Sequence, residues 1–115
     1  MKYVDGYVIP ILKKNLKTYA RMAKMGAKFW MENGALDYKE CVGEDLKPPW
    51  GMPFSKLLKL KPGETVIFSY IVFKSRAHRD RVNKLVMKEM EKMDEMDMPF
   101  DMKRMVYGGF QVLVE

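Results

Sequence analysis

Residues 65–73 read TVIFSYIVF, the strongest strand pattern in this 115-residue chain. Apart from Ser69, the segment is apolar on both of its alternating faces. A strand with two apolar faces is typical of the centre of a sheet that is covered on both sides. The sequence therefore predicts a central strand here, with a covering layer on each face.

Three further segments have the alternation of strands. In the first of them the pattern ends at Pro10, which has no amide hydrogen to donate to a neighbouring strand. In the second, which is shorter and less hydrophobic, Glu40 shares a face with Tyr38. We expect these strands at residues 3–9, 35–43 and 105–114.

Two segments instead repeat their apolar residues with the period of a helix, at residues 16–33 and 76–93. Asn15 stands where the first helix needs an N-cap, and Gly34 stands just after its end. Ser75 is placed to cap the second helix. Both helices therefore have start signals of their own.

The longest connection, residues 44–63, carries four prolines and two glycines, so it predicts a loop with at most one or two helical turns near residues 54–60. Its Trp50 either closes over a site as a lid or packs on the edge of the sheet. A second connection, residues 94–104, carries acids and Pro99, which end the preceding helix.

The order strand, helix, strand, strand, helix, strand favours an α+β fold of the ferredoxin-like βαββαβ type. Its four-stranded antiparallel sheet carries both helices on one face, and residues 1–115 make a single domain. Two helices cover only one face, yet the strands are apolar on both faces. A second copy of the chain is the simplest cover for the other face, so we expect a homodimer.

The composition excludes several classes of protein. No apolar run reaches the roughly 18 residues that a membrane span needs, and the first ten residues lack the apolar centre of a signal peptide. Cys41 is the one cysteine, so no internal disulfide can form. We therefore expect a cytoplasmic protein without membrane contact.

Five stretches of the sequence resemble the YbaA-like family of uncharacterised bacterial proteins. They are YVDGYV at 3–8, NGAL at 33–36, EC at 40–41, ETVIFSY at 64–70 and MPFDMKRMVYGGF at 98–110. The family resembles the dimeric α/β-barrel superfamily, in which two ferredoxin-like sheets close face to face. The resemblance implies the same dimer that the uncovered face predicts, and it implies no established reaction.

Several polar residues are candidates for a ligand site in or beside the sheet. Tyr7 and Ser69 offer hydroxyl groups, and Asp5 with Glu40 could point carboxylates into an otherwise apolar interior. An exposed edge or a buried ion pair would give the same pattern for the two acids. His78, the one histidine, is either a surface or interface residue or an acid–base group at the edge of a pocket.

The stretch YGGF at 107–110 is a further candidate. Paired glycines in a strand mark a bulge or a close approach by another group. Packing within the chain explains Gly108 and Gly109, or a ligand or partner lies against them, with Tyr107 giving a hydroxyl group and Arg104 a fixed charge. His78 and Cys41 are too few to hold zinc, so we expect no metal site and no cofactor.

The net charge of +6 is concentrated before and along the first helix. Six cations stand there without an acid until Glu32: Lys13, Lys14, Lys17, Arg21, Lys24 and Lys28. They form either a solvated face or a surface that binds an acidic partner or nucleic acid. Nucleic acid is the weaker version, because the aromatic residues of this helix belong to its apolar side.

The leading functional hypothesis is a small-molecule binding protein with a pocket built from Tyr7, Ser69, Tyr107 and nearby polar groups. The alternative is an interaction protein that uses the basic helix face. A cofactor-independent oxygenase-like activity follows from the superfamily analogy alone, and a shared fold does not imply a shared reaction. The sequence shows no nucleophile paired with a base and no phosphate-binding loop.

Overall fold

A computed structural model describes residues 1–93 and 97–115 of the chain. The connection predicted over residues 94–104 begins with residues 94–96, which lie outside the described residues. The elements, in order, are β1 (Tyr3–Leu12), α1 (Leu16–Glu32), β2 (Asp37–Val42), α2 (Phe54–Leu57), β3 (Glu64–Phe73), α3 (Arg76–Glu91) and β4 (Val106–Gln111). Short 3-10 turns cover Lys13–Asn15 and Met102–Arg104.

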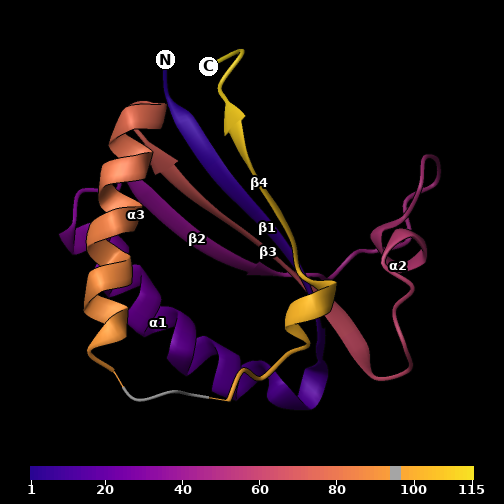
Figure 1. Cartoon of the computed structure of the whole chain (residues 1–115). Coiled ribbons are helices and arrows are strands. Elements are labelled where there is room, and N and C mark those ends of the chain that lie inside the picture. The colour runs from indigo at the N-terminus through magenta and orange to yellow at the C-terminus, as the bar shows by residue number, and fades with distance from the viewer. Residues whose placement is uncertain (94–96) are drawn as a thin grey trace.

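The four strands form one antiparallel sheet in the order β2-β3-β1-β4. Helices α1 and α3 both lie against the same side of the sheet, as Figure 1 shows. The predicted α+β class, the four-stranded antiparallel sheet and the central position of residues 65–73 are therefore confirmed. Neither α1 nor α3 covers the other side of the sheet, and the short α2 borders only its edge, where Phe54 lies near Phe68.

The predicted end of the first strand at Pro10 is wrong. β1 continues to Leu12 and pairs with β3 over its full length, including Pro10 opposite Val66. β4 pairs with β1 only as far as Val8 opposite Val106. Pro10 therefore lies beyond the reach of β4, where its missing N–H removes no bond to that strand.

The predicted cap of α1 is also wrong in its chemistry, although the helix starts where expected. The Asn15 side chain makes no capping hydrogen bond; its amide instead donates to the Pro99 carbonyl at 3.1 Å. Ser75 does cap α3, because its Oγ accepts from the His78 amide at 3.1 Å. Gly34 ends α1 with a φ of +114°, a conformation that favours glycine.

Four predicted elements are shorter in the structure. The strand predicted over 35–43 is β2, Asp37–Val42, and the strand predicted over 105–114 is β4, Val106–Gln111. Helix α1 ends at Glu32 rather than at 33, and α3 ends at Glu91 rather than at 93. A strand ends where its neighbour no longer pairs with it, and the last residues of a helix fray. The local sequence pattern therefore does not predict either boundary to the exact residue.

The main core lies between the sheet and the two long helices. One cluster joins β3 to both helices through Phe73, Trp30 and Val82. A second joins β1 and β3 to the first half of α1 through Ile11, Ile67 and Tyr19. Burial of these side chains stabilises the sheet on its helix face by roughly 1.5–3 kcal/mol for each large aliphatic group.

The loop that holds α2 stands clear of α1 and α3 (Figure 1). Trp50, within this loop, is 82% exposed, so it does not pack on the sheet edge, one of the two predicted roles. No helix in the described part of the chain has both the length and the apolar character needed to cross a bilayer.

Candidate functional site

A row of polar side chains crosses all four strands on the helix face. Glu40 on β2 pairs with Ser69 on β3, Ser69 pairs with Tyr7 on β1, and Tyr7 pairs with Tyr107 on β4. The rings of Tyr7 and Tyr107 stack at 5.8 Å with an angle of 15° between their planes. Register alone therefore brings four of the predicted site residues into one line.

Glu40 is the centre of a hydrogen-bonded group at one end of this row. Tyr19 of α1 donates to its Oε1 at 2.7 Å, and Tyr38 of β2 donates to its Oε2 at 2.6 Å. Burial, followed by the Glu40 hydrogen bond, raises the pKa of both tyrosines above its ordinary value. Both hydroxyls therefore stay protonated and act as donors.

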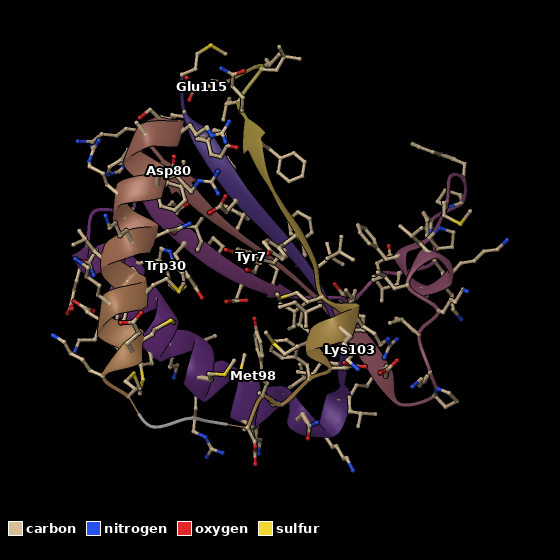
Figure 2. The ribbon with its side chains drawn as sticks, viewed as in Figure 1. Tyr7, Trp30, Asp80, Met98, Lys103 and Glu115 are labelled. Carbon is tan, nitrogen blue, oxygen red and sulfur yellow. The ribbon has the colours of Figure 1, made fainter. Side chains whose placement is uncertain are left out.

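Tyr7 lies on the same face, between the two core clusters. Figure 2 shows Tyr7 on the helix side of the sheet. Trp30 of α1 and Met98 are labelled on the same side. Burial raises the pKa of Tyr7 to about 12, with smaller contributions from Asp5 and Glu40. Its hydroxyl makes no hydrogen bond within residues 1–93 and 97–115, and Tyr7 lines neither cavity beside Glu40.

Two cavities meet at the Glu40 group. The larger, about 520 Å³, lies between α1, the end of α3 and the segment 98–100. The smaller, about 440 Å³, lies between α1 and β2. Tyr19, Tyr38 and Glu40 line both cavities, so their hydrogen bonds form the wall between them.

The walls of the larger cavity are mostly apolar. They consist of aromatic and methionine side chains, chiefly Phe29, Trp30, Phe100, Met22, Met90 and Met98. Gly26 lets α1 approach this wall, because a Cβ there would lie 3.3 Å from the Tyr38 hydroxyl. A concave apolar surface with a few convergent polar groups is the usual form of a small-molecule site.

Asp5 lies one row away, in a buried ion pair. It is 4% exposed, and it accepts hydrogen bonds from Arg79 at 3.2 Å and from Asn83 at 3.3 Å. Asn83 in turn accepts from the Trp30 indole at 2.9 Å. Burial raises the pKa of Asp5 above its ordinary value, and the Asn83 and Arg79 contacts offset this only in part.

Arg79 is held on the sheet by further contacts. Its guanidinium lies 4.9 Å from the centre of the Tyr3 ring and donates to the Tyr3 hydroxyl at 3.4 Å. Its Nε is 3.0 Å from a carboxylate oxygen of Asp80 but is not aligned for a hydrogen bond. The Asp5 carboxylate therefore joins α3 to the sheet.

His78 and Arg104 lie apart from the polar row. His78 Nδ1 accepts from the Lys74 amide at 2.9 Å, which ties the start of α3 to the end of β3. Burial, then the charges of Lys74 and Arg81, lowers the pKa of His78. Arg104 binds Glu64 through two hydrogen bonds of 2.6 and 3.0 Å at the far end of the sheet.

The two glycines of YGGF lie on opposite faces of β4. A Cβ on Gly109 would come within 3.0 Å of the Tyr3 hydroxyl oxygen and two Tyr3 ring carbons, so packing within the chain requires this glycine. Gly108 pairs with Gly6 on the face without helices, where the Phe110 ring lies over both. The β1–β4 register is continuous, so of the two alternatives for these glycines the bulge is absent from this strand pair.

The six cations at and along α1, from Lys13 to Lys28, form a basic stripe. All six are exposed to solvent, from the 3-10 turn to the last turns of the helix. Lys24 lines the smaller cavity, and the other five members line neither cavity of the Glu40 group. Its binding of an acidic partner stays a prediction. Among the described residues, no group of three or more His, Cys, Asp or Glu side chains is placed to hold a metal ion.

Sequence reasoning missed Tyr19, Tyr38 and the methionine wall as site residues. Tyr19 falls on the apolar stripe of α1, where an aromatic residue is normally part of the core. The clue was Glu40 itself, since a carboxylate on the core face of a strand needs donors from whatever packs over it.

The family follows from the whole sequence. A family model described as "Protein of unknown function (DUF1428)" matches residues 2–102. The chain belongs to this family. The "Uncharacterized protein YbaA" of Escherichia coli (strain K12) is 37% identical over 117 residues, which cover 100% of this chain and 99% of the relative. The protein of the same name from Shigella flexneri matches equally.

The YbaA-like resemblance is therefore confirmed, and the names of these relatives state no activity. Among solved structures, the "De novo designed protein Foldit4" is similar with a TM-score of 0.49 at 11% identity. The likeness covers 97% of this chain and 99% of that chain.

Proposed function

We propose that the protein binds a small, mainly apolar molecule in the larger cavity, with Glu40 as the polar anchor. The observation that carries the proposal is the Tyr19–Glu40–Tyr38 group, which places a hydrogen-bonded carboxylate on the wall of a mainly apolar cleft of about 520 Å³. Cavities of roughly 300–1,000 Å³ suit drug-sized ligands. The methionine wall adapts its shape to the ligand, because methionine side chains are flexible and polarizable.

Binding can be measured with the neutral fluorescent probe N-phenyl-1-naphthylamine. We expect Met98→Trp to weaken binding at least about fivefold, because the larger side chain fills the cavity that Met98 lines. Met102→Trp is the matched control: Met102 has similar exposure, 50% against 40%, and lies outside the cavity lining. We expect its affinity to stay within about twofold of the wild type.

Two outcomes would contradict the proposal. One is an absence of probe binding by the wild-type protein. The other is equal weakening by both tryptophan variants, which would place the probe elsewhere, for example on the open face of the sheet.

We also propose that the chain forms a homodimer through the face of the sheet that carries no helix, as the ferredoxin-like half of a dimeric α/β barrel. This open face is an apolar surface centred on β1, β3 and β4 and includes Val4, Val8, Phe68, Tyr70, Val106 and Phe110. Three of these side chains, Phe68, Val106 and Phe110, are 47–60% exposed. Such a patch on a lone chain marks an interaction surface.

The total exposed area supports the homodimer. The chain exposes 8464 Å², whereas a folded monomer of 13.5 kDa is expected to expose roughly 6,500 Å². The excess of exposed area is roughly 1,900 Å². This is similar in size to the surface that each chain of an obligate homodimer buries in the interface. The chain is also flat, 39 × 38 × 20 Å, with a radius of gyration of 15.1 Å against roughly 13 Å for this length.

A pair of valines with matched exposure tests the dimer. Val106 on the open face is 55% exposed, and Val42 on the opposite side of the sheet is 53% exposed. Because a charge buried in an interface is costly, we expect Val106→Asp to give a folded monomer of 13.5 kDa in light scattering. Val42→Asp should keep the doubled mass of the wild type. A wild-type monomer at about 10 µM would contradict the proposal.

A further inference from the structure

The larger cavity has an unusual charge for this protein. The chain has 21 Lys and Arg residues and a net charge of +6. Nevertheless, within the part of the chain that the structure describes, no Lys, Arg or His lines the cavity, and two glutamates, Glu40 and Glu91, do. An acidic cavity in a basic protein attracts cations and repels anions.

Glu40 also differs from the other shielded carboxylates. Asp5 is paired with Arg79, and the largely buried side chain of Glu64 is paired with Arg104. Among residues 1–93 and 97–115, no cation lies within ion-pair distance of Glu40, and its two partners are neutral tyrosine hydroxyls. Each carboxylate oxygen therefore retains acceptor capacity without a positive partner.

The aromatic side chains beside Glu40 suit a cation as well. Tyr19 and Phe100 contact each other edge to face at 5.8 Å, and Trp30 and Tyr38 lie 6.0 Å apart. All four rings line the cavity that Glu40 lines. Ring faces attract organic cations within roughly 6 Å of the ring centre, most strongly where water is excluded.

We infer that the ligand of this cavity is a lipophilic cation, an ammonium group attached to an aromatic or alkyl body. The ammonium group donates to the free acceptor positions of Glu40, and the body contacts the aromatic and methionine wall. The inference rests on the proposed small-molecule function and names its ligand class. The smaller cavity offers a contrast, because Lys24 and Lys39 line it.

Three naphthalene probes of nearly equal size separate charge from apolar contact: 2-naphthylmethylammonium, 2-naphthylmethanol and 2-naphthoate. In calorimetric titrations at pH 7, we expect the ammonium probe to bind at least about tenfold more tightly than the alcohol, because its hydrogen bond to Glu40 is charge-assisted. The carboxylate probe should bind most weakly.

The Glu40→Gln variant assigns the preference to one residue. It keeps the shape of the side chain and removes its charge, so we expect the ammonium probe to lose about tenfold in affinity while the alcohol changes less than about twofold. Glu44→Gln makes the same change of charge on the exposed loop and should leave all three affinities unchanged. Circular dichroism checks that each variant is folded.

The possible results separate the inference from the function on which it rests. Equal binding of the ammonium and alcohol probes, or tighter binding of the carboxylate, would overturn the cationic ligand and leave the cavity as a binding site. Failure of all three probes to bind would overturn both. The wild-type comparison needs no variant, so it decides even if Glu40→Gln does not fold.

Discussion

Replacing Arg79 by methionine is expected to lower the free energy of unfolding by about 3–5 kcal/mol at pH 7. The variant leaves the Asp5 carboxylate, which is 4% exposed, with the Asn83 amide as its remaining side-chain donor. A buried charge that loses its partner carries most of its desolvation cost. This loss is a large part of the 5–15 kcal/mol that stabilises an ordinary domain.

The pH dependence of the unfolding free energy should identify the unpaired Asp5 as the cause of the stability that Arg79→Met loses. Burial already raises the pKa of Asp5 above its ordinary value in the wild type, and loss of Arg79 raises this pKa further. An acidic group whose pKa is higher in the folded state than in the unfolded state contributes its full stabilisation below the unfolded pKa. This contribution is lost as the pH rises through the folded pKa. The cost of Arg79→Met should therefore shrink as the pH falls from 7 towards about 4.

Urea denaturation at a fixed protein concentration measures both effects, and a double variant is the control. Combining Asp5→Asn with Arg79→Met removes both charges, so we expect it to recover at least about 2 kcal/mol of the loss at pH 7. A cost below about 1 kcal/mol for Arg79→Met, or a cost that is constant from pH 4 to pH 7, would show that Asp5 does not depend on Arg79.

The second large effect is expected at Arg104. Its guanidinium donates to both oxygens of Glu64 and to the carbonyls of Leu58 and Lys59. The Glu64 side chain is 7% exposed, so Arg104→Met should also cost about 3–5 kcal/mol at pH 7. The same contacts join the end of the α2 loop to the 3-10 turn before β4, and loss of Arg104 should loosen both.

The pKa of Glu64 is shifted in the direction opposite to that of Asp5. The hydrogen bond from Arg104 holds the pKa of Glu64 below its ordinary value. Its contribution to stability is therefore present above the unfolded pKa and is lost as the pH falls through the lower folded pKa. Arg104→Met should remove this acid-sensitive part of the unfolding free energy, so the difference in stability between wild type and variant should shrink as the pH falls below the unfolded pKa of Glu64.

Arg81→Met is the matched control for this prediction. Arg81 is exposed and makes no ion pair in the described part of the chain, so its replacement should change stability by less than about 0.5 kcal/mol. If Arg104→Met behaves like Arg81→Met in urea denaturation at pH 7, the Glu64 pair is not a stabilising contact.

These two ion pairs also show where prediction from sequence reached its limit. Asp5 and Arg104 were candidate ligand residues, yet each binds an oppositely charged partner on an element far away in sequence. The sequence left the buried ion pair open for Asp5. It could not name Arg79, because that contact depends on how α3 lies across the sheet.

The candidate site was predicted in part. Tyr7, Ser69 and Tyr107 were expected to form a pocket with nearby polar groups such as Glu40, yet of these four residues only Glu40 lines the larger cavity. Their common row follows only from the β1–β3, β2–β3 and β1–β4 registers. The hydrogen bond from Tyr19 to Glu40 was not foreseen, because Tyr19 comes from a helix that packs over the strand. Tyr38 was expected on the same face as Glu40, but not as its donor.

The sequence by itself determined the strand at residues 65–73, the two long helices and the apolar character of both sheet faces, since each depends on the spacing of residues a few positions apart. Tertiary structure decided the rest: β1 continues through Pro10 because β4 ends before it, and Glu40 meets Tyr19 because α1 packs over β2. Such contacts depend on register and helix placement, which local periodicity does not contain.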